Sequence, residues 1–68
     1  MAEDVVALTK ARSMLTILLA SCQQTLLILE ATGNVLDHEM TEDLRRMIAR
    51  TEREIDGLTE RLHGKRSQ

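Results

Sequence analysis

An uncharged stretch of seventeen residues, from Ser13 to Leu29, limits what this chain can fold into more than any other feature. It lies between Arg12 and Glu30 and is rich in leucine and isoleucine. Neither proline nor glycine occurs before Gly33, so nothing in this part of the sequence breaks a helix. The stretch therefore predicts a long helix with more apolar surface than one neighbouring helix covers.

The chain has 68 residues, which allows one domain with a marginal core unless a disulfide, a metal or oligomerisation adds stability. Cys22 is its single cysteine, which excludes an internal disulfide and favours a reducing, cytoplasmic location. With His38 and His63 as the only histidines, the sequence has no zinc-binding pattern. We expect no metal and no cofactor, so oligomerisation is the remaining source of stability.

The composition predicts an all-α protein, because the chain has no proline, no aromatic residue and only three glycines. We expect one domain over residues 1–68, with a first helix over about 3–31, a connection over about 32–40, a second helix over about 41–63 and a frayed tail over 64–68. Gly33 is a typical helix stop, and either Asp37 or Thr41 begins the second helix. Such a short connection makes the helices antiparallel neighbours in a hairpin.

The apolar arcs of the two helices differ in width. At 100° per residue, the first helix has an apolar arc of about 200°. Its central stripe consists of Ala7, Leu8, Ala11, Leu15, Leu18, Leu19, Cys22, Leu26 and Leu29, and Met14, Ile17, Ser21 and Ile28 widen it. The second helix has a seam of roughly 100°, as in coiled coils. This seam consists of Met40, Leu44, Met47, Ile48, Thr51, Ile55, Leu58 and Leu62.

The difference in width leaves half of the first helix's arc uncovered, because one seam covers only part of it. Twofold pairing of this strip with the same strip on a second copy is the simplest remedy, and it gives a four-helix bundle. We predict an oligomer interface formed by Leu8, Met14, Leu15, Ile17, Leu18, Ser21, Cys22, Leu26, Ile28 and Leu29. We interpret Cys22 as a small buried hydrophobe and expect Ser21 to bond its own backbone, or alternatively to fix the register at the dimer axis.

Four arginines, Arg46, Arg50, Arg53 and Arg61, lie on one side of the second helix with Gly57 between them. Such a row is able to follow a phosphate backbone, but the net charge of −2 and nearby carboxylates argue against it. Pairs such as Glu42 with Arg46 and Arg50 with Glu54 have the spacing of helical ion pairs. Gly57 costs helix stability, which indicates the close approach of another backbone.

Several function classes are disfavoured by the sequence. No nucleophile is paired with a base and no glycine-rich phosphate loop occurs, so we predict that the chain is not an enzyme and has no catalytic residue. The uncharged stretch falls short of the ~20 residues of a membrane span and has polar residues near its centre. The leading hypothesis is a small interaction or regulatory protein acting as a homodimer. The alternatives are a nucleic-acid-binding regulator that uses the arginine row, and a subunit of a hetero-oligomeric complex that docks through the first helix.

Overall fold

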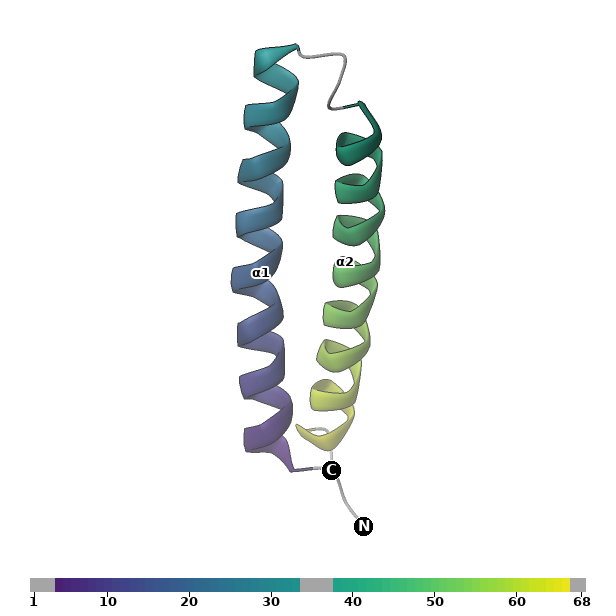
Figure 1. The fold of residues 1–68 in the computed structure, drawn as a ribbon. Helices are drawn as coiled ribbons and strands as arrows, with labels where there is room; N and C mark the ends of the chain where they lie inside the picture. The colour runs from purple at the N-terminus through teal and green to yellow at the C-terminus, as the bar shows by residue number, and fades with distance from the viewer. Residues whose placement is uncertain (1–3, 34–37, 67–68) are drawn as a thin grey trace.

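The computed structural model describes residues 4–33 and 38–66, which form two helices and no strand. Helix α1 covers Val5–Thr32 and helix α2 covers His38–Arg66. The two helices run side by side in opposite directions, so the start of α1 and the end of α2 lie at the same end of the hairpin (Figure 1). The predicted all-α helical hairpin is therefore confirmed.

The ends of α1 are set by two local features of the sequence. Asp4 is the N-cap, and its carboxylate accepts a hydrogen bond of 2.9 Å from the backbone N–H of Val6. At the other end Gly33 has φ of 62°, the left-handed conformation that glycine adopts without steric cost. The predicted helix stop at Gly33 is confirmed.

The bounds of α2 differ from the prediction by three residues at each end. The helix already includes His38, and Thr41 lies within it with 9% exposure, so Thr41 is not the cap. The alternative cap, Asp37, lies outside the described residues. Gly64 is helical rather than part of a frayed tail, because Leu62, at 1% exposure, anchors the last turns in the core.

The helices meet along an inner seam with a seven-residue repeat. On α1 its buried and half-buried members are Leu8, Ala11, Leu15, Leu19, Cys22, Leu26 and Leu29. On α2 they are Thr41, Leu44, Ile48, Thr51, Ile55, Leu58 and Leu62. The hydroxyl of Thr51 donates to the carbonyl of Met47 at 2.8 Å, so this buried polar group is satisfied.

The best-buried core lies where the start of α1 packs against the end of α2, around Leu8, Leu58 and Leu62. Towards the middle of the hairpin, Cys22 is 7% exposed and its Sγ lies 3.8 Å from the Sδ of Met47. The interpretation of Cys22 as a small buried hydrophobe is confirmed.

Ala7 and three larger residues assigned to the central stripe of the first helix or to the seam of the second lie outside the inner seam. Leu18 is 46% exposed, Met40 is 58% exposed and Met47 is 38% exposed. On α2, Thr41 rather than Met40 belongs to the inner seam. The reason is that a strict seven-residue repeat drifts by about 20° per heptad from the 100° helical wheel used for the prediction.

Gly57 does not mark the close approach of another backbone within the chain, because a Cβ built there meets no atom within 4 Å. The Gly57→Ala variant is therefore expected to raise the free energy of unfolding by about 1 kcal/mol, the difference in helix propensity between the two residues. Urea denaturation followed by circular dichroism measures the change. A loss of stability on this substitution would show that the site is filled by something other than solvent.

Candidate functional site

The face of α1 that points away from α2 has its own regular pattern, which we name the outer strip. Its residues alternate at spacings of three and four, the spacing of a coiled-coil seam. All of them are exposed: Ala7, Lys10, Met14, Ile17, Ser21, Gln24, Ile28 and Ala31. The largest apolar side chains among them are Met14 at 63%, Ile17 at 68% and Ile28 at 57% exposure.

The structure divides the predicted oligomer interface into two parts. Five residues belong to the inner seam and face α2 of the same chain: Leu8, Leu15, Cys22, Leu26 and Leu29. The other five are exposed: Met14, Ile17, Leu18, Ser21 and Ile28. The surface on which a partner can bind is therefore narrower than the predicted list.

The centre of the outer strip is polar. Ser21 and Gln24 are both exposed, and no hydrogen bond within the described residues engages the Ser21 hydroxyl or the Gln24 amide. The predicted bond from Ser21 to the backbone one turn back is wrong. It is Thr25 whose hydroxyl donates to the carbonyl of Ser21, at 2.9 Å.

The hairpin exposes more surface than a compact monomer of its mass. Its radius of gyration is 15.5 Å, whereas a compact chain of this length has about 11 Å. Its accessible surface is 5309 Å² for 7.7 kDa, and the mass scaling for folded monomers gives about 4,300 Å². The excess of about 1,000 Å² is similar to the ~800 Å² that each partner buries in a standard protein interface.

Comparison with known proteins gives no relative. The chain matches no protein-family model, no curated protein and no solved structure. The site must therefore be judged from its own geometry.

Helix α1 is also long and apolar enough to cross a membrane, by length and composition. Only 6% of its most apolar stretch is buried in the hairpin. A core helix of a water-soluble protein or a signal sequence meets the same criterion, so the finding is weak support for a membrane span.

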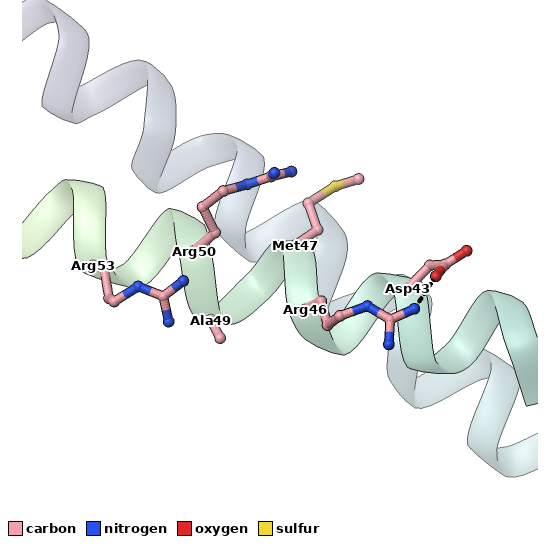
Figure 2. Close-up of a pocket in the computed structure, with 6 residues that line it drawn as sticks. All are labelled: Asp43, Arg46, Met47, Ala49, Arg50 and Arg53. Carbon is pink, nitrogen blue, oxygen red and sulfur yellow. Dashed lines mark hydrogen bonds and ion pairs between the residues drawn. The ribbon is translucent and has the colours of Figure 1, made fainter.

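The arginines of α2 form a spread-out cationic surface rather than a single site. An open depression of about 520 Å³ is lined by Asp43, Arg46, Met47, Ala49, Arg50 and Arg53. Figure 2 shows that the three guanidinium groups lie apart along α2 and do not converge on one point. Arg46 pairs with Asp43, whereas Arg50 and Arg53 have no ion pair within the described residues.

The fourth arginine of the predicted row, Arg61, lies at a different depression. This second depression, of about 610 Å³, lies between the helices and is lined by Ala11, Leu15, Glu54, Gly57, Leu58 and Arg61. The structure thus places Arg46, Arg50 and Arg53 along one depression, with their guanidinium groups apart, and Arg61 at another.

The ion pairs of α2 differ from those predicted by spacing. Glu42 pairs with Arg45 rather than with Arg46, at 2.8 Å. Arg45 also reaches Glu30 of α1 at 2.7 Å, and this hydrogen bond and charge raise the pKa of Arg45. The contact joins the helices near the connection, on an exposed surface where ion pairs contribute little stability.

The predicted oligomer interface lacks four members of the outer strip: Ala7, Lys10, Gln24 and Ala31. The helical wheel sorts residues by angle and polarity. These residues belong to the outer strip because they continue its regular spacing of three and four residues. That spacing is visible in the sequence once the inner seam is fixed. Within the described residues, no group of three or more His, Cys, Asp or Glu side chains is placed to hold a metal ion.

Proposed function

We propose that the chain is a non-enzymatic protein–protein interaction module that acts as a homodimer in the cytoplasm. The observation that carries this proposal is the outer strip, with Met14, Ile17 and Ile28 all more than half exposed. Large apolar side chains aligned on one exposed helix face, here on either side of a polar centre, are typical of a surface that binds another protein.

A second copy of the chain is the partner that this surface favours. Closed twofold symmetry is the commonest form of oligomer, and it pairs a patch with itself. Two hairpins joined through their outer strips make a four-helix bundle in which the two α1 helices are central. The charged outer surface of α2 then stays accessible to a further protein, which is where a regulatory activity would act.

Mass action provides a test of the homodimer. Since folding and association are coupled in a small dimer, the urea midpoint should rise with protein concentration. We expect this rise between micromolar and hundred-micromolar chain, with reductant present and detergent absent. A midpoint independent of concentration, with the chain fully helical, would contradict the proposal.

Nucleic-acid binding is the second candidate function, because Arg50 and Arg53 have no carboxylate partner within the described residues. This function requires that the chain bind duplex DNA or RNA at low salt. It also requires that Arg50→Ala combined with Arg53→Ala lower both the affinity and the salt dependence. No binding at low salt would remove this candidate and leave the homodimer proposal intact.

A hetero-oligomeric complex is the third candidate. It uses the same outer strip, but a different protein covers it. In that case the isolated chain forms undefined oligomers rather than a dimer, and the sedimentation measurement described below distinguishes the two.

A further inference from the structure

The outer strip has a nearly symmetric order of residue types about its centre. Reading from Met14, the order is methionine, isoleucine, serine, glutamine, isoleucine and alanine. The polar pair of Ser21 and Gln24 therefore has an isoleucine on each side, Ile17 before it and Ile28 after it. Beyond the isoleucines, a large side chain at Met14 corresponds to a small one at Ala31.

The order of residue types on one helix therefore complements the same order read in the opposite direction. We propose that the two α1 helices of the dimer pack antiparallel, with Ser21 of each chain opposite the partner's Gln24; this inference rests on the homodimer proposed above. The same register sets Ile17 against the partner's Ile28 and Met14 against the partner's Ala31. Apolar side chains then meet apolar ones, and the long side chain of Met14 meets the short one of Ala31.

The polar layer selects this register. The Ser21 hydroxyl and the Gln24 amide both donate and accept hydrogen bonds, and neither has a partner within the described residues. At the dimer axis they satisfy one another. Slipping by seven residues in either direction sets Gln24 against Met14 or Ile28 instead, which buries an unpaired amide.

A parallel arrangement is less favourable for three reasons. It places the two Lys10 ammonium groups against each other, whereas the antiparallel register leaves Lys10 outside the overlap. It pairs Met14 with the partner's Met14 and Ala31 with the partner's Ala31, so one layer is crowded and another is underfilled. It also aligns the two helix dipoles, which repel in that orientation.

Disulfide trapping distinguishes these arrangements. The background is the Cys22→Ala variant, which removes the native thiol. Ile17→Cys and Ile28→Cys are made separately in it, one of them labelled with ¹⁵N. The two are unfolded and refolded together, then oxidised, and the cross-linked species are weighed by mass spectrometry. Leu27→Cys is the matched control, because Leu27 is 66% exposed on α1 but lies outside the outer strip.

The antiparallel register predicts mixed disulfides between the Ile17→Cys and Ile28→Cys chains in large excess over disulfides between identical chains. Identical positions then lie eleven residues out of register, or about 16 Å apart along the helix, beyond the ~7 Å limit between the Cα atoms of a disulfide. The Leu27→Cys control should cross-link poorly with either variant.

Three other outcomes would overturn the inference. Efficient disulfides between identical chains, with few mixed ones, mean that the two α1 helices are parallel. That result contradicts the antiparallel register but agrees with the homodimer. A dimer in sedimentation that no pair of variants cross-links means that another face forms the interface. A monomer in sedimentation refutes the homodimer itself, and with it this register.

Discussion

Ile17→Glu is expected to convert the dimer into folded monomers. In the hairpin Ile17 is 68% exposed, so a carboxylate there stays hydrated and α1 remains helical. In the dimer the same carboxylate is buried without a partner, once in each chain. Burying an unpaired charge costs several kcal/mol, so even ~2 kcal/mol for each of the two chains raises the dissociation constant by about 1,000-fold.

Sedimentation measures the loss of the dimer, and circular dichroism measures whether the monomer stays helical. Leu27→Glu is the matched control, since Leu27 has a similar exposure of 66% but lies away from the outer strip. The control should remain dimeric. If Ile17→Glu also remained dimeric, with unchanged affinity, the outer strip would not be the interface.

Leu62→Ala is expected to have the largest effect on the hairpin itself. Leu62 is 1% exposed and packs with Leu8 and Leu58 in the best-buried part of the core. Truncation removes buried methyl groups and leaves a cavity, so the free energy of unfolding should fall by about 3 kcal/mol. For a two-helix chain, this loss is a large part of the total stability.

Urea denaturation at one fixed protein concentration measures this loss. Leu27→Ala serves as the control and should change the free energy of unfolding by less than ~0.5 kcal/mol, because the side chain is largely in solvent. Equal losses for the two variants would contradict the position of the core.

The pattern of the sequence was sufficient to predict two helices, their antiparallel arrangement and the helix stop at Gly33. It also predicted that Met14, Ile17 and Ile28 are left exposed by α2, because an apolar arc much wider than one seam must leave part of itself uncovered. These features depend on composition and periodicity over many residues. Small errors at single positions do not affect them.

The features that were predicted wrongly depend on the exact path of the seam. Thr41 is buried and Met40 is exposed because the helices follow a seven-residue repeat, and hydrophobicity alone favours the methionine. Arg46 pairs with Asp43 rather than with Glu42. Ion pairs at spacings of three and four residues compete on an exposed helix, where their energies differ little. The full set of residues in the outer strip follows from the position of the inner seam.

Sedimentation equilibrium of the unmodified chain, at several micromolar concentrations with reductant and without detergent, tests the central claim most directly. The homodimer predicts one species of twice the 7.7 kDa chain mass. A folded monomer at all concentrations, or a series of undefined larger species, would contradict the homodimer. It would mean that the outer strip of α1 binds a different protein or a membrane.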